Sequence, residues 1–289
     1  MKKGTKIGLI IVLILALVGG GLCITAFALG VNFKEITEMA EKGDFSFGPW
    51  GSVSENLIVE VPLQGSEENL SEGTLASGDK YTVADEMGSL VIDLDFGDLT
   101  VKSSESDEIY LECGDDEKYF ELNVSVNTVH IKNKNKHSWI NVTMPKATLY
   151  LPESLGFDSV EMDIDAGSCT IEADIFANLL TVDVDAGTAD IESMNVSWAE
   201  FDCDAGKIEF NGTVVNGGEA DVDAGAVIIH LPDVDVTDYN YEIEVSAGAV
   251  DIDDRSFSGL DEEQYIQNHA RAGWTLTCDA GKIEMNLNK

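Results

Sequence analysis

The residues of this sequence best suited to binding chemistry are eight aspartates that occur in pairs. The pairs are Asp163 with Asp165, Asp183 with Asp185, Asp202 with Asp204, and Asp221 with Asp223. The members of a pair are two residues apart in the sequence, so both side chains would point to the same face of a β-strand. Carboxylate oxygens are ligands that Ca²⁺ prefers, and calcium held between neighbouring pairs is one interpretation.

The second aspartate of each pair also begins a repeated tripeptide, which supports a structural interpretation. The Asp-Ala-Gly copies are Asp165–Gly167, Asp185–Gly187, Asp204–Gly206, Asp223–Gly225 and Asp279–Gly281, with Ser246–Gly248 as a variant. The first four are 20, 19 and 19 residues apart. In a tight turn Asp can hydrogen-bond the backbone two residues on. We expect Gly167, Gly187, Gly206, Gly225, Gly248 and Gly281 to supply the positive φ that such turns commonly need.

Repeated carboxylates also occur in hydrolases, but this arrangement argues against catalysis. An acid and base pair needs two carboxyl groups whose surroundings hold their pKa values apart, inside a cleft. Here the same aspartate returns in every repeat, as a turn requires and a single active site does not. We therefore expect no enzymatic activity and no cofactor; an enzyme acting on polysaccharide is the weakest alternative.

Apolar residues keep a fixed register around each turn, which predicts an all-β fold. Positions one and three before the aspartate, and four and six after it, are apolar in every copy. Each repeat is thus a strand, a turn and a strand with one apolar face. Because one unit buries nothing alone, we expect a single-domain β-solenoid with coils about 4.8 Å apart. The predicted inward residues are Met162, Ile164, Cys169, Ile171, Val182, Val184, Ala189, Ile191, Phe201, Cys203, Ile208, Phe210, Ala220, Val222, Val227, Ile229, Ile243, Val245, Val250, Ile252, Leu276, Cys278, Ile283 and Met285.

The spacing lengthens twice near the C-terminus. Asp223 and Ser246 are 23 residues apart, and Ser246 and Asp279 are 33 apart. Within the second insertion, residues 259–270 are predicted to form a short helix on the flank or end of the stack. The chain stops soon after its last repeat, so strand edges at that end could pair with another copy. A self-assembling scaffold is therefore an alternative to a binding module.

A basic row and five cysteines have competing interpretations. His130, Lys132, Lys134 and Lys136 would share one face of a strand, either as a binding patch or, as we favour, to protect an edge strand. Cysteines in an exported protein suggest disulfides. Cys203 and Cys278 occupy equivalent positions about three coil steps apart, or ~14 Å, which is beyond disulfide reach. We expect the cysteines to be small buried hydrophobic residues.

The N-terminal region predicts a membrane anchor. Lysines precede an uncharged apolar run over residues 7–33, which is long enough to span a hydrocarbon core of ~30 Å. We predict one transmembrane helix within residues 1–33, with a cytoplasmic N-terminus, a stalk over 34–80 and an extracytoplasmic solenoid over 81–289. A cleaved signal peptide ending near residues 26–28 is the alternative.

The charge of the chain limits its partners. The formal net charge is −37, which disfavours nucleic acid and anionic lipid surfaces because both would repel it. Cationic peptides or other basic envelope components fit better. The composition therefore favours a non-catalytic binding or sensing module on the cell envelope.

The sequence resembles the bacterial family called "putative adhesin", a domain of unknown function in membrane-anchored proteins of Gram-positive bacteria. The resemblance rests on residues 150–152 (Tyr-Leu-Pro), residues 159–165 and the Asp-Ala-Gly repeats behind an N-terminal span, and it covers residues 81–289. It implies a solenoid-like β domain outside the cell, sometimes linked to envelope-stress regulation. The family carries no established catalytic residues, so the resemblance assigns none here.

Overall fold

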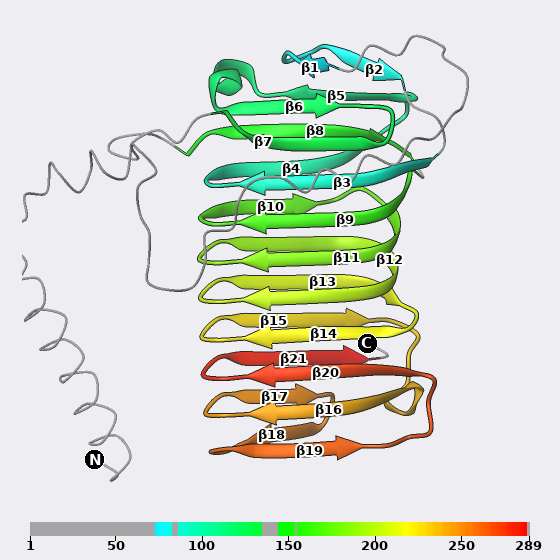
Figure 1. The fold of residues 1–289 in the computed structure, drawn as a ribbon, viewed down its shortest axis with the longest axis vertical. Coiled ribbons are helices and arrows are strands. Elements are labelled where there is room, and N and C mark those ends of the chain that lie inside the picture. The colour runs from blue at the N-terminus through cyan, green and yellow to red at the C-terminus, as the bar shows by residue number, and fades with distance from the viewer. Residues whose placement is uncertain (1–72, 83–85, 135–143, 154, 288–289) are drawn as a thin grey trace, which may run out of the picture. The chain divides into compact units, whose positions relative to one another are not determined.

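The computed structural model describes residues 73–82, 86–134, 144–153 and 155–287. These residues form β-strands and two short 3-10 helices, η1 (Gly114–Tyr119) and η2 (Val236–Asp238). Each Asp-Ala-Gly turn joins two strands into one coil, and the coils lie one upon another (Figure 1). The predicted all-β solenoid is confirmed.

The strands form two parallel stacks that meet at the turns. In spatial order the leading stack, which enters the turns, contains β7 (Thr128–Asn133), β3 (Glu86–Leu94), β9 (Gly156–Ile164), β11 (Ile175–Val184), the second half of β12 (Thr188–Cys203), β14 (Gly217–Val222), β20 (Ala272–Cys278) and β16 (Tyr239–Val245). The trailing stack contains β8 (Lys146–Pro152), β4 (Gly97–Ser104), β10 (Gly167–Ile171), the first half of β12, β13 (Lys207–Val214), β15 (Ala226–Leu231), β21 (Lys282–Leu287) and β17 (Ala249–Ile252). Within both stacks, ladder hydrogen bonds therefore join neighbouring coils.

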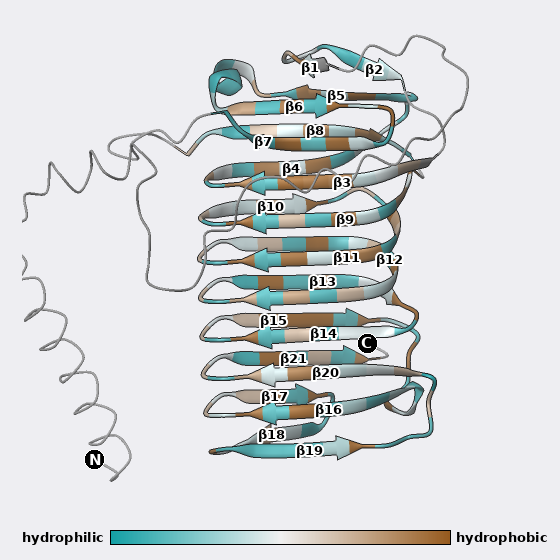
Figure 2. Ribbon diagram, viewed as in Figure 1, coloured by the Kyte–Doolittle hydropathy of each residue, from teal (hydrophilic) through white to brown (hydrophobic). Residues whose placement is uncertain are grey.

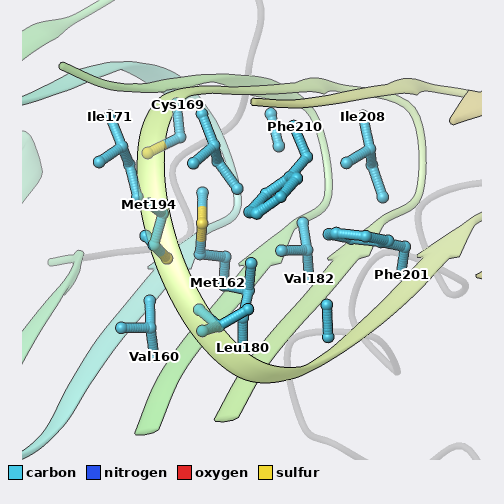
Figure 3. Close-up of a cluster of buried hydrophobic side chains, with 14 of the residues drawn as sticks. Val160, Met162, Cys169, Ile171, Leu180, Val182, Met194, Phe201, Ile208 and Phe210 are labelled. Carbon is cyan, nitrogen blue, oxygen red and sulfur yellow. The ribbon is translucent and has the colours of Figure 1, made fainter. Parts of the chain in front are cut away.

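The apolar side chains of the two stacks face each other and form the core. Hydrophobic and hydrophilic residues alternate along the strands (Figure 2). The close-up shows Met162, Val182 and Phe201 from the leading stack facing the trailing strands (Figure 3). All of the inward residues predicted from the repeats are buried, with exposed fractions of 0 to 2%. The predicted register is therefore confirmed at every one of these positions.

The predicted role of the turn glycines is wrong. Gly167, Gly187, Gly206, Gly225, Gly248 and Gly281 are absent from the positive-φ glycines of the described residues, which are Gly78, Gly97, Gly114 and Gly217. A Cβ atom on any of the six would instead lie within 2.7 Å of the carbonyl oxygen of the corresponding glycine in a neighbouring coil. That carbonyl accepts an interstrand hydrogen bond, as Gly187 O does from Lys207 N at 3.0 Å. The column of glycines thus permits close stacking of the turns.

Antiparallel strands cover both ends of the described stack. β5 (Glu108–Glu112) pairs with β8, and β6 (Phe120–Val124) pairs with β7. Short strands β1 (Gly73–Leu75) and β2 (Lys80–Thr82) lie outside them. At the other end β18 (Arg255–Ser258) pairs with β17, and β19 (Glu262–Ile266) pairs with β16. The helix predicted over residues 259–270 is therefore wrong, because this segment supplies an edge strand that satisfies the backbone groups of β16.

The coils do not stack in chain order. β20 lies between β14 and β16, and β21 lies between β15 and β17, so the last repeat occupies an internal position. Cys203 and Cys278 are consequently two coil steps apart, with Val222 between them, and not three as expected. All four described cysteines are buried free thiols, as predicted. Burial raises the pKa of Cys169 to about 12.

The predicted membrane anchor lies outside the described residues, as does most of the predicted stalk. Among the residues that the structure describes, no helix has the length and apolar character needed to cross a membrane. The span over residues 7–33 therefore stays a prediction from the sequence.

We predict that Gly206→Ala lowers the thermal stability of the protein strongly. The new methyl group would meet Gly187 O at 2.5 Å, and the backbone there is fixed by the coil stack. Crowding of this kind costs roughly 1–3 kcal/mol. Thermal unfolding followed by circular dichroism measures the effect.

The matched control is Gly156→Ala, because the nearest atom to its added Cβ would be 4.0 Å away. Equal melting temperatures for the two variants would contradict the role of close approach.

Candidate functional site

Backbone pairing brings the first members of the aspartate pairs into a single line on the outer face of the leading stack. We call this line the strand column, and its members are Asp93, Asp163, Asp183, Asp202 and Asp221. Each is the direct cross-strand neighbour of the next. Sequence reasoning predicted four of these residues; Asp93 is added because β3 pairs with β9 in the same register.

The second members form a parallel line along the turns, the turn column. Its members are Asp165, Asp185, Asp204, Asp223 and Asp279. The amide of Asp185 donates to Ile164 O at 3.1 Å, and the amide of Ala186 donates to Asp165 O at 3.0 Å. In the described turns at 185–187, 204–206 and 223–225, backbone hydrogen bonds join each turn to the neighbouring coil. In these three turns, no aspartate side chain accepts a hydrogen bond from the backbone two residues further on. For Asp185, Asp204 and Asp223 the expected hydrogen bond from the side chain to the backbone is therefore wrong.

The strand column is electrostatically strained. Partial burial raises the pKa of Asp163, Asp183, Asp202 and Asp221, and the neighbouring aspartates raise it further. The carboxylates are nonetheless exposed to water, which weakens their repulsion. The stack thus holds like charges close together, and water reduces the electrostatic repulsion between them.

One end of the strand column is closed by a basic residue. Lys132 of β7 is the cross-strand neighbour of Asp93, and its ammonium group lies 3.6 Å from Glu121 Oε1. β7 pairs with β3 on one side and β6 on the other, so it is not an edge strand. Edge protection by His130, Lys132 and Lys134 is therefore wrong, since Lys132 faces the acids of adjacent strands. Lys136 lies outside the described residues.

The columns do not by themselves form a metal cage. Within the described ranges, no group of three or more His, Cys, Asp or Glu side chains converges in a way that could hold a metal ion. Calcium usually takes 6–8 oxygen ligands, so two facing carboxylates would need help from water or backbone carbonyls. Calcium between the coils stays a prediction.

A separate groove lies on the leading stack at the strand ends away from the turns. This indole groove has a volume of about 340 Å³ and is lined by Trp198, Asn240, Glu242, Tyr265, Arg271 and Gly273, among others. Trp198 Nε1 donates to Glu200 Oε1 at 3.0 Å, which fixes the indole on the surface. The Tyr265 ring is 67% exposed, and nearby Glu242 raises the pKa of its hydroxyl.

Gly273 lies on the floor of the indole groove, next to Gly217 of the neighbouring strand β14. Trp198, Gly217, Gly273 and Asn240 occupy one row across four neighbouring strands. At Gly217 a side chain would collide with the backbone of Gly273. At Gly273 the nearest atom to an added Cβ would be Asn240 O, 3.5 Å away, so the space above it is open. The missing side chain of Gly273 leaves a hollow between the indole and Asn240.

Hydrogen bonds hold the far wall of the groove in place. Asn240 Nδ2 donates to the carbonyls of Ala270 and Ala272 at 2.8 and 3.2 Å, and its Oδ1 accepts from Asn268 N at 3.0 Å. Beneath the groove, the Tyr241 hydroxyl and Trp274 Nε1 are buried and have no hydrogen-bond partner among the described residues. The walls are thus fixed before any ligand arrives.

A second groove, of about 410 Å³, crosses the starts of β9, β11 and the second half of β12. Phe176 and Val215 line it and are 50% and 64% exposed. Asn178 Nδ2 donates to Asp158 Oδ1 there at 3.4 Å. Sequence reasoning missed both grooves; only the glycines beside Trp198 in the repeat alignment could have indicated the hollow.

Comparison with known proteins gives a family and distant structural likenesses. The family described as Toastrack DUF4097 matches residues 87–288. A "putative cell adhesion protein" from Clostridium sporogenes ATCC 15579 is 12% identical, with a TM-score of 0.37 over 75% of this chain and 100% of that chain. A "putative adhesin" from Bacteroides fragilis NCTC 9343 is 11% identical, with a TM-score of 0.31 over 74% of this chain and 98% of that chain. No curated protein matches.

We predict that Asp183→Asn stabilises the fold at neutral pH. The folded-state pKa of Asp183 lies above its ordinary value of 3.8, so the folded state binds the proton more tightly than the unfolded state. Stability therefore rises as the pH falls through the raised pKa values of the strand column. Removing one charge should gain about 1 kcal/mol or less, since the group is partly exposed. Melting temperatures between about pH 7 and pH 4 measure both effects.

Glu105→Gln is the control, because it removes one charge from an exposed loop away from the column. If the wild type and Asp183→Asn lose the same stability between acid and neutral pH, repulsion within the column does not destabilise the fold.

The calcium hypothesis predicts that the melting temperature rises with Ca²⁺ at constant ionic strength. Calcium bound between coils would stabilise only the folded state. The measurement is a thermal melt across micromolar to millimolar Ca²⁺, compared with Mg²⁺ at the same concentrations. A melt that Ca²⁺ leaves unchanged excludes a calcium site, and equal effects of both ions indicate general screening.

Proposed function

This chain belongs to the Toastrack DUF4097 family, and on that premise we propose that it is a non-catalytic, adhesin-like surface module that binds cationic ligands. The observation that carries the proposal is the pair of aspartate columns on the leading stack. A regular line of exposed carboxylates creates a negative potential that attracts cations over long range.

The proposal places the solenoid outside the cell. The apolar run over residues 7–33, with lysines before it and acids after it, supports a single N-terminal membrane anchor and a cytoplasmic N-terminus. An outward-facing acidic domain would then meet basic peptides and other basic envelope components. A part in sensing envelope stress would follow if such a ligand altered contacts near the membrane.

Self-assembly through the stack ends is the second candidate. Within the described residues, β18 and β19 pair on one side only, which leaves a backbone edge at the end of the solenoid. The premise that the last repeat forms this end is wrong, because β20 and β21 lie inside the stack. Glu262 and Glu263 on β19 give the real edge a negative charge that opposes pairing with another copy. We therefore favour binding over assembly.

We predict that the full chain binds hexalysine in a salt-dependent way through the strand column. Binding measured by calorimetry should weaken at least about tenfold from about 20 mM to about 150 mM salt, because the attraction is screened. The double variant Asp183→Asn/Asp202→Asn removes two central charges and should weaken low-salt binding by about three- to tenfold.

The double variant Glu105→Gln/Asp107→Asn has the same net charge but leaves the columns intact, so it separates local from overall charge. Equal losses in both double variants would argue against the columns as the binding surface. Absence of hexalysine binding to the wild type, or binding that salt does not affect, would overturn the proposed function.

A further inference from the structure

The walls of the indole groove present two aromatic rings to solvent. Trp198 donates its N–H to Glu200 at 3.0 Å, and Tyr265 is 67% exposed on β19, the edge strand four steps along the same sheet. Between the two rings, Gly273 lines the groove without a side chain. Aromatic rings arranged around a hollow attract cations through their negative faces, and Trp is the strongest ring for this interaction.

The charge around the groove matches a cation. Glu219, Thr275, Glu242 and Tyr265 form the row next to the glycine floor, because β14, β20, β16 and β19 pair in register. Glu244 and Glu263 are cross-strand neighbours one row further on. Arg271 is the basic residue among those that line the groove, and it is exposed.

We propose that the indole groove is a binding site for an organic ammonium group, held against the Tyr265 ring with its cross-strand neighbour Glu242 as counter-charge, while Trp198 closes the opposite end of the groove. The inference rests on the proposed function, because it names the cationic chemistry that one part of this surface selects. The volume of about 340 Å³ falls within the range of small-molecule sites. The ammonium can belong to a small molecule or to a lysine side chain, since the groove recognises the shared group.

Arg271 distinguishes this ligand from others. It repels an ammonium ion, attracts an anion, and has little net effect on an uncharged sugar. The substitution Arg271→Ala should therefore strengthen ammonium binding, weaken anion binding, and leave a neutral saccharide nearly unaffected. Whether Arg271→Ala raises or lowers the binding affinity thus reports the charge of the ligand.

The test is calorimetric titration of the full chain with choline at constant ionic strength, with maltose and acetate as neutral and anionic comparisons. Choline should bind at one site. Tyr265→Ala should weaken it several-fold, and Arg271→Ala should tighten it about threefold. Gly273→Leu fills the floor of the hollow and should abolish binding. Gly156→Leu adds a side chain in the groove that Phe176 and Val215 line, and it should leave choline binding unchanged.

Hexalysine supplies the same ammonium group on a peptide. If Gly273→Leu weakens both choline and hexalysine, the groove takes lysine side chains as well as small molecules. If choline does not bind the wild type, or binds equally to Gly273→Leu, the inference is overturned. Hexalysine binding that still depends on Asp183 and Asp202 would then leave the proposed function standing. Maltose binding that Gly273→Leu abolishes and Arg271→Ala leaves unchanged would overturn the ammonium assignment in favour of a saccharide.

Discussion

The solenoid depends on parallel backbone pairing between coils at constant register. Each turn rests directly on the next, with the carbonyl of one glycine accepting a hydrogen bond from the neighbouring coil, as between Lys207 and Gly187. Side chains at the glycine positions would block this approach. Because β-strand side chains alternate, the same register places every inward residue on an apolar neighbour. Core packing and coil spacing are therefore consequences of one constraint.

That constraint cannot align apolar residues without aligning charged ones as well. Asp163 and Asp183 are held as neighbours by the ladder that also buries Met162 and Val182. Partial burial raises the pKa of both carboxyl groups, and their aspartate neighbours raise it further. The line of aspartates gives the leading stack a regular negative surface, which is the property on which the proposed binding of cations rests.

The repeat pattern predicted the solenoid and its core because both are local: the inward positions recur at fixed offsets from each turn. Contacts between segments outside the repeat could not be predicted from such offsets. β20 lies between β14 and β16, a pairing of strands that are not consecutive in the chain and that the spacing of the repeats does not specify. The indole groove depends in turn on that insertion, because it brings Gly273 beside Gly217. The prediction for the turn glycines was also wrong. The sequence shows that a glycine is present, but it does not show whether a positive φ or a close backbone contact requires it.

The internal position of β20 and β21 has a consequence for how the molecule is made. A chain synthesised from its N-terminus offers β14, β15, β16 and β17 before their common neighbours exist. Without residues 272–287 these strands lack their common neighbours, and four parallel ladders cannot form. This end of the domain therefore lacks an internal coil in any chain that stops before β20. The four ladders of this coil therefore require a chain that is intact through β21.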